Sequence, residues 1–233
     1  MRFKAILFDL DGTLVDSAED LRDALNALLL EQGLAPLDLA AVKGMVGDGV
    51  GKLVERGLAA RGGDCERLAA HIARFMALYA PNAARRTRPY PGVHEVLAVL
   101  QARGLHLAVV TNKPRAVTMA ILEALGLTPF FDAVVGGDTV GQRKPDPAPL
   151  LHAMQALGAA PAETLMVGDN AHDVAGARAA GVAVAVAAHG YSAVPATELG
   201  ADRVLDGFAG LPALVSGRAP IRSNRRARRG GRA

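Results

Sequence analysis

The stretch "KAILFDLDGTLVD", residues 4–16, places two carboxylates directly behind an apolar run. Residues 3–10 have the hydrophobic content of a buried strand, and Asp9 and Asp11 follow before Gly12. Burying unpaired carboxylates is costly, so two acids at the end of such a strand indicate a site that uses them. The other residues of such a site must come from elsewhere in the chain.

Short β-rich runs alternate with helical stretches along most of the chain. After residues 3–10, the clearest strands are residues 106–111, 133–137, 164–169 and 182–188. Helical periodicity falls at residues 93–104, 115–126, 148–158 and 171–181. Strands that alternate with helices of this length indicate βαβ units and a parallel sheet covered on both faces. We therefore expect an α/β fold with a doubly wound parallel sheet.

One segment interrupts this alternation. No convincing strand lies between the first strand and Tyr90, whereas residues 17–33, 49–62 and 65–80 have helical periodicity. A connection of this length is too long for a simple loop. We expect a small α-helical domain at 15–87, inserted into a discontinuous core domain formed by 1–14 and 88–216.

The charge of the chain is concentrated at its C-terminal end. The net charge is +3, but 7 of the 26 basic residues lie in 217–233, which leaves 19 basic against 23 acidic residues in the body. The Arg-rich tail has little to bury and is expected to be disordered. Contact between this tail and nucleic acid is an alternative to a tail without a specific partner.

Composition also limits where the protein is expected to act. The longest apolar runs, such as residues 182–188, fall short of the roughly 20 residues that span a bilayer. The first residues turn acidic too soon for a secretory signal, and the lone Cys65 has no internal partner for a disulfide. We expect a cytoplasmic protein that does not contact membranes.

The unusual polar residues follow the expected strands. Because the carboxyl ends of parallel strands meet at one edge of the sheet, these residues are expected to share one cleft. They are Asp9, Asp11, Thr111, Asn112, Lys144 and Asp169.

Such a cleft suits a hard cation and a phosphoryl group. Clustered carboxylates repel one another unless a cation neutralises them, and oxygen ligands favour Mg²⁺. The phosphoryl oxygens would meet Lys144, the hydroxyl of Thr111 and backbone N–H groups of the turn at Gly12 and Thr13. Asp9 would then attack phosphorus, while Asp11 would protonate the leaving group and later deprotonate water.

Four ordered motifs resemble those of the haloacid dehalogenase superfamily: "DLDGT" (9–13), "TN" (111–112), "KPDP" (144–147) and "GDNAHD" (168–173). The resemblance implies Asp9 as nucleophile and Asp11 as general acid and base. It assigns the phosphate-binding roles to Thr111 and Lys144. It also implies Mg²⁺ held by Asp9, the backbone carbonyl of Asp11 and Asp169, with Asp173 as a ligand or close by.

The same resemblance narrows the reaction class. Dehalogenases of this family lack the second acid of the first motif, so Asp11 favours phosphoryl transfer. Where many relatives have Ser after Asp169, this chain has Asn170. The helical insertion lies where the family's small cap lies.

The cap is expected to select the substrate. Residues 46–59 and 90–104 resemble bacterial phosphatases of 2-phosphoglycolate more than sugar phosphate mutases or phosphonatases. A glycine-rich turn near Gly47, Gly49 and Gly51 would offer backbone N–H groups to an anion, and Lys52 would add a positive charge. Asn112 joins the expected substrate-binding residues.

We therefore expect a Mg²⁺-dependent phosphomonoesterase that converts 2-phosphoglycolate to glycolate and phosphate. One alternative is a phosphatase for another small phosphorylated metabolite, such as a sugar phosphate. A more remote alternative is a catalytically silent binding protein that its tail attaches to nucleic acid.

Overall fold

The computed structural model describes residues 3–217. Its strands are β1 (Ala5–Phe8), β2 (Val15–Asp16), β3 (Arg88–Pro89), β4 (His106–Val110), β5 (Ala133–Val135), β6 (Thr164–Gly168), β7 (Ala183–Ala187) and β8 (Arg203–Leu205). Its α-helices are α1 (Ala18–Glu31), α2 (Leu39–Lys43), α3 (Val50–Ala59), α4 (Leu68–Tyr79), α5 (Val93–Ala102), α6 (Arg115–Ala124), α7 (Ala148–Ala156), α8 (Ala171–Ala179) and α9 (Leu211–Val215).

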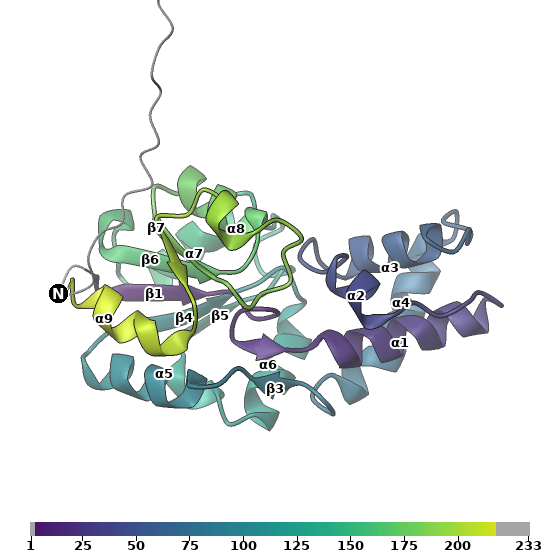
Figure 1. Cartoon of the computed structure of the whole chain (residues 1–233), viewed down its shortest axis with the longest axis horizontal. Helices are drawn as coiled ribbons and strands as arrows, with labels where there is room; N and C mark the ends of the chain where they lie inside the picture. The colour runs from purple at the N-terminus through teal and green to yellow at the C-terminus, as the bar shows by residue number, and fades with distance from the viewer. Residues whose placement is uncertain (1–2, 218–233) are drawn as a thin grey trace, which may run out of the picture.

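A parallel sheet in the order β5-β4-β1-β6-β7-β8 forms the body of the molecule (Figure 1). Strand β1 lies at its centre, with Ala5 in register with His106 of β4 on one side and with Thr164 of β6 on the other. The chain first places β4 and β5 on one side of β1 and then β6, β7 and β8 on the other. This reversal of strand order leaves a crevice at the carboxyl ends of β1 and its neighbours. The expected α/β fold with a doubly wound sheet is confirmed.

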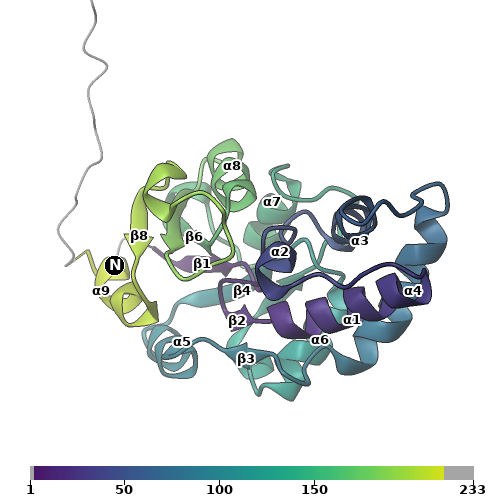
Figure 2. The ribbon, with the colours of Figure 1, turned by 45° about the vertical axis from the view of Figure 1, so that its right-hand side comes forward.

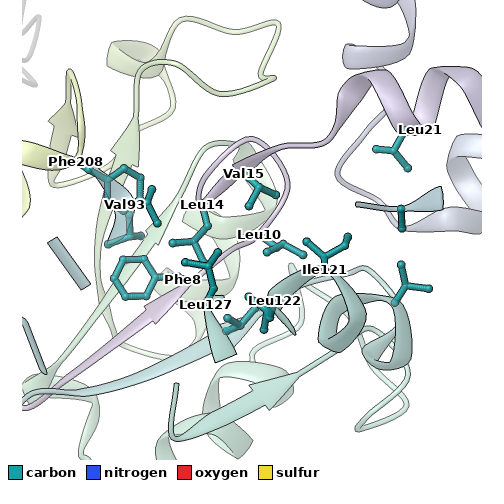
Figure 3. Packing of buried hydrophobic residues seen from close by; sticks show 14 of the residues in the cluster. Phe8, Leu10, Leu14, Val15, Leu21, Val93, Ile121, Leu122, Leu127 and Phe208 are labelled. Carbon is teal, nitrogen blue, oxygen red and sulfur yellow. The ribbon is translucent and has the colours of Figure 1, made fainter. Parts of the chain in front are cut away.

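Alternate side chains of β1 enter two separate hydrophobic cores. Ile6 and Phe8 pack with residues of α5, α6 and α9, whereas Ala5 and Leu7 pack with α7 and α8. The fully buried Phe8 ring stacks against Phe208 with 6.3 Å between the centroids (Figure 3). Burying a side chain of this size contributes about 1.5–3 kcal/mol. The central strand is therefore fixed from both faces, which gives the acids that follow it a rigid support.

Helices α1–α4 lie together beyond the carboxyl edge of the sheet and form the helical cap (Figures 1 and 2). Leu25 of α1, Leu58 of α3 and Phe75 of α4 are fully buried in the hydrophobic cluster that this region shares with the core. The sequence predicts helices in this region, but it does not predict the short helix α2. The boundaries proposed for the two domains, at residues 14/15 and 87/88, stay a prediction.

The outgoing and returning connections of the cap are tied together. Strands β2 and β3 pair antiparallel, with Val15 opposite Pro89. The buried carboxylate of Asp20 accepts hydrogen bonds from the backbone N–H groups of Arg86 and Thr87, with a shortest distance of 2.8 Å. The cap is thus anchored at its base by a carboxylate that takes no part in the sheet-edge site.

Two further expectations concern the rest of the chain. Among residues 3–217, no helix combines the length and the hydropathy that a bilayer span requires. Of the Arg-rich tail, residues 218–233 lie outside the described residues, so its disorder and its possible contact with nucleic acid stay predictions.

Candidate active site

Asp9 and Asp11 leave the end of β1 in different directions. Asp9 is buried, and its backbone N–H donates to the carbonyl of Val167 at 2.9 Å, which extends the pairing with β6. The carboxylate of Asp11 accepts a hydrogen bond from the hydroxyl of Ser17 and lies 2.6 Å from the ammonium of Lys113. The two acids therefore have different immediate partners, although only one residue separates them.

Asp9, Asp169 and Asp173 form a buried cluster in which ligand oxygens lie within 4.8 Å of one another. Asp169 directly follows β6 and accepts a hydrogen bond from the backbone N–H of Tyr191 at 2.7 Å. Asp173 lies in the first turn of α8, where one oxygen accepts from the backbone N–H groups of Asp169 and Asn170. Loops from two neighbouring strands thus bring together acids that are about 160 residues apart in sequence.

Lys144 is buried between two of these carboxylates. Its ammonium lies 2.9 Å from Asp9 Oδ1 and 2.7 Å from Asp173 Oδ1, and it donates to the carbonyl of Val110 at 2.7 Å. Asn112 fixes the backbone of Lys144 from both sides, because its side chain accepts from Lys144 N–H and donates to the Lys144 carbonyl, each at 2.9 Å. The end of β4 thereby positions the lysine that follows β5.

Burial and like charge shift the proton affinities of the cluster. Burial is the main cause that raises the pKa of Asp9 to about 6; Lys144 opposes this shift, and Asp173 adds to it. Burial, together with Asp173 and Asp9, raises the pKa of Asp169 well above its usual range. Burial alone would lower the pKa of Lys144, but Asp173 and Asp9 outweigh it and keep the lysine charged.

The donor set of this cluster fits a hard cation. One ammonium faces three buried carboxylates, and Asp9 Oδ1 has no well-aligned hydrogen bond among the described residues although Lys144 lies beside it. Clustered carboxylate oxygens with spare acceptor capacity are ligands for a hard divalent cation. The Asp11 carboxylate does not join the cluster, because it faces Ser17 and Lys113; its backbone carbonyl stays a proposed ligand.

Thr111 is buried and lines the cavity beside Asp9, as the expected contact with a phosphoryl group requires. Asn112 is also present, but its amide is already occupied by Lys144 and by the carbonyl of Gly47, at 2.8 Å, in the cap. Its evident role is to position Lys144 and to connect core and cap. Direct binding of substrate by its side chain would require these bonds to break.

The backbone N–H groups of Gly12 and Thr13 form hydrogen bonds within their own turn. Gly12 N–H donates to the Val15 carbonyl and Thr13 N–H donates to the Leu10 carbonyl, so these two donors are not available to a substrate. Gly12 has φ +81°, and a Cβ atom there would lie 2.4 Å from Asp169 Oδ2. The turn therefore needs glycine for close approach to Asp169, and the Thr13 hydroxyl donates to Asp169 at 3.3 Å. Both residues support the acid cluster.

Lys52 lies on the cap surface and does not line the cavity. The expectation that it binds substrate was based on the glycine-rich start of α3, but the side chain of Lys52 is 57% exposed and pairs with Glu55 on the same helix at 2.6 Å. The cavity between cap and core is lined from the cap by Leu21, Val46, Gly47, Gly49, Val50 and Leu53. Lys52 is not among these lining residues, so its role as a substrate ligand stays a prediction.

Lys113 is the site residue that sequence reasoning missed. It directly follows the "TN" motif, is buried, and lines the same cavity as Asp9 and Asp11. A lysine beside a recognised motif was an available signal, but sequence alone does not distinguish a buried ammonium from a solvated one.

Asn170 is the N-cap residue of α8 and lies next to Asp169. Its side-chain oxygen accepts from the backbone N–H of His172 at 2.9 Å, and its amide donates to Asp169 Oδ1 at 3.2 Å. His172 in turn contacts Asp48 of the cap, with 2.6 Å between His172 Nε2 and Asp48 Oδ1. The Asn found in place of Ser thus retains hydrogen bonds to both the helix and the acid cluster.

A parallel sheet with an acid pair after β1, a buried lysine, a second acid cluster after β6 and a helical cap defines one class of protein. The chain belongs to the haloacid dehalogenase-like hydrolase family, whose model matches residues 6–187.

Curated relatives within this family are more specific. The chain is 52% identical to a phosphoglycolate phosphatase of Rhodospirillum rubrum over 89% of each chain, and 43% identical to one of Caulobacter vibrioides over 89% of this chain and 88% of that one. A solved structure of a predicted phosphoglycolate phosphatase from Haemophilus somnus has a TM-score of 0.88 at 33% identity, covering 92% of this chain and 98% of that one.

Proposed function

We propose that this chain is a phosphoglycolate phosphatase, which hydrolyses 2-phosphoglycolate to glycolate and inorganic phosphate. The observation that carries the reaction class is the buried group formed by Asp9, Asp169, Asp173 and Lys144 at the carboxyl edge of the sheet. The choice of substrate rests on the names of the relatives, which are 39–52% identical over most of the chain.

Asp9 is the proposed nucleophile. One of its carboxylate oxygens forms a bond to phosphorus while the bond from phosphorus to the glycolate oxygen breaks, which leaves an acyl phosphate on Asp9. Lys144, 2.9 Å from Asp9 Oδ1, keeps this carboxylate oriented and offers positive charge to the phosphoryl oxygens. The hydroxyl of Thr111 supplies a further donor from the same wall of the cavity.

Asp11 is the proposed general acid and base. It gives its proton to the departing glycolate oxygen, and it then takes a proton from the water that attacks phosphorus and releases phosphate from Asp9. Ser17 and Lys113 hold its carboxylate in place through hydrogen bonds. The cap contacts the core beside this site through the hydrogen bond that Asn112 donates to the Gly47 carbonyl.

Magnesium is the proposed cofactor. Asp9, Asp169 and the backbone carbonyl of Asp11 would hold it, with Asp173 as a further ligand or an immediate neighbour. When bound, the ion neutralises negative charge on the phosphoryl oxygens and the carboxylates.

A substrate panel tests the proposal. The purified protein is expected to release phosphate from 2-phosphoglycolate with a kcat/KM at least about tenfold above that for a hexose monophosphate or 2-hydroxyethyl phosphate. A sugar phosphate at the top of the ranking would favour the alternative phosphatase. Absence of hydrolysis for every phosphomonoester in the presence of Mg²⁺ would support the catalytically silent alternative, against which the complete acid and lysine cluster argues.

Magnesium is expected to stabilise the protein more at about pH 7.5 than at about pH 5. Because burial raises the pKa of Asp9 to about 6, from 3.8, the metal-free fold binds this proton more tightly than the unfolded chain. The stability that this bound proton gives to the metal-free fold therefore falls as pH rises from about 4 to about 6. A bound cation offsets the resulting repulsion, whereas protons compete with it at low pH.

The measurement is the difference in Tm between EDTA-treated and Mg²⁺-loaded protein at each pH. Asp169→Asn, which removes one ligand charge, is the matched control and should reduce the difference at both pH values. Equal Mg²⁺-induced shifts at the two pH values in the unaltered protein would count against binding at this cluster.

A further inference from the structure

Lys113 places a second buried cation in the cavity between core and cap. It follows β4 and precedes α6, its side chain is 3% exposed, and its ammonium contacts both oxygens of Asp11, at 2.7 and 2.6 Å. Lys144 is held apart from it by Asp9 and Asp173. The two lysines therefore contact different acids, and the reaction at phosphorus accounts for Lys144 alone.

The hydroxyl of Tyr79, at the end of α4, lies in the surroundings of Lys113. Tyr79 is fully buried, and its hydroxyl has no hydrogen-bond acceptor among the described residues. The Lys113 ammonium lies 5.1 Å from the centre of its ring. Burial, which Lys113 opposes, raises the pKa of this hydroxyl to about 12, so it remains a neutral O–H donor. Tyr79 is not among the residues that line the cavity, so it acts on the Lys113 ammonium and does not touch a ligand itself.

The rest of the cap wall is apolar. Leu21, Val46, Val50 and Leu53 line the cavity opposite Asp9, Asp11 and Lys113. The part of the substrate that packs against this apolar wall loses its hydrating water. A charged group there needs a partner of opposite charge. An ammonium has three N–H donors, and in a dry site its hydrogen bonds to a carboxylate are strong.

We infer that Lys113, held in position by Tyr79, binds the carboxylate of the substrate and thereby selects phosphate esters that carry a carboxylate at their far end. This inference rests on the proposed function and replaces Lys52 as the specificity cation. The non-reacting end of the substrate is then recognised by a core lysine beside the general acid, and not by a lysine on the cap surface. Lys113 contacts Asp11 and the substrate together, so charge recognition and the orientation of the acid depend on the same side chain.

A pair of substrates separates these two roles. In 2-hydroxyethyl phosphate the carboxylate of 2-phosphoglycolate is replaced by an uncharged CH₂OH group, while the phosphate ester is unchanged. Lys113→Met is expected to lower kcat/KM for 2-phosphoglycolate at least about tenfold more than for 2-hydroxyethyl phosphate, mainly through KM. Lys113→Arg, which retains a cation, should keep more of the preference. Lys4→Met, a change at an exposed lysine far from the cavity, should leave both rates unchanged.

Tyr79→Phe provides a second variant that does not depend on tolerating the loss of a buried charge. It removes a buried hydroxyl without an acceptor and keeps the ring that stacks on Phe75 at 5.4 Å, so the protein should fold. We expect its preference for 2-phosphoglycolate over 2-hydroxyethyl phosphate to fall about threefold or more.

The outcomes distinguish the inference from the proposed function. If the unaltered protein does not prefer 2-phosphoglycolate, the proposed function fails, and the inference fails with it. If the unaltered protein shows the preference but Lys113→Met lowers both rates equally, the inference alone is overturned, and Lys113 only positions Asp11. If Lys113→Met does not fold, Tyr79→Phe decides, and an unchanged preference in that variant overturns the inference.

Discussion

Replacing Asp9 with Asn is expected to lower kcat for 2-phosphoglycolate by at least about 10³-fold while the protein stays folded. The amide is a poor nucleophile and does not form the acyl phosphate that the proposed reaction needs. The size and shape of the side chain are retained, and the change removes one negative charge from the buried group formed with Asp169 and Asp173. Steady-state phosphate release measures the loss.

Thermal unfolding provides the control for this variant. Because burial already disfavours the charge on Asp9, Asp9→Asn should unfold at the same temperature as the unaltered protein or higher in EDTA. Acid quenching of the unaltered protein with substrate labelled in the phosphoryl group should trap label that hydroxylamine releases, whereas the variant should trap none. A variant with near-normal turnover, or one that still traps label, contradicts the assignment of Asp9.

The strand ends were predictable because the carboxyl edge of a parallel sheet is fixed by chain direction. Once residues 3–10 and 164–169 are recognised as parallel strands, Asp9 and Asp169 must come out on the same edge. The structure has both strands side by side, with Phe8 in register with Val167. Lys144 was placed by its motif, and the hydrogen bonds from Asn112 now explain how its loop is held.

What escaped prediction depends on burial within the cap and on hydrogen bonds over long sequence separations. Lys52 and Lys113 are equally plausible cations in sequence, but α3 turns Lys52 to solvent, whereas Lys113 lies under α4. Asp20, inside a helical stretch, showed no sign that it would bind the returning chain at Thr87. The short strand β8 and helix α2 were too brief for a periodic pattern to identify them.

Replacing Lys144 with Met is expected to cause the largest combined loss of activity and stability. Lys144 contacts Asp9 and Asp173, and its removal leaves buried carboxylates without their cation. Breaking a buried ion pair from one side costs about 3–5 kcal/mol. The loss in free energy of unfolding should be greater at about pH 8 than at about pH 5, because Lys144 holds the pKa of Asp9 down and the cluster takes up protons without it. Denaturant titration at the two pH values in EDTA measures this difference.

The double variant Lys144→Met with Asp173→Asn separates the structural role of this lysine from its chemical one. It removes the ammonium and one of its anionic partners together, while Asn keeps an oxygen that accepts from the backbone N–H groups of Asp169 and Asn170, as Asp173 does now. The free energy of unfolding should recover by about half or more relative to Lys144→Met, since most of the cost of breaking a buried pair is the unpaired charge that remains. Phosphate release should stay at least about 10²-fold below normal, because the ammonium that lies beside Asp9 is then missing. Recovery of activity together with stability would mean that Lys144 only maintains the fold, and the proposed contact between this lysine and the substrate would have to be abandoned.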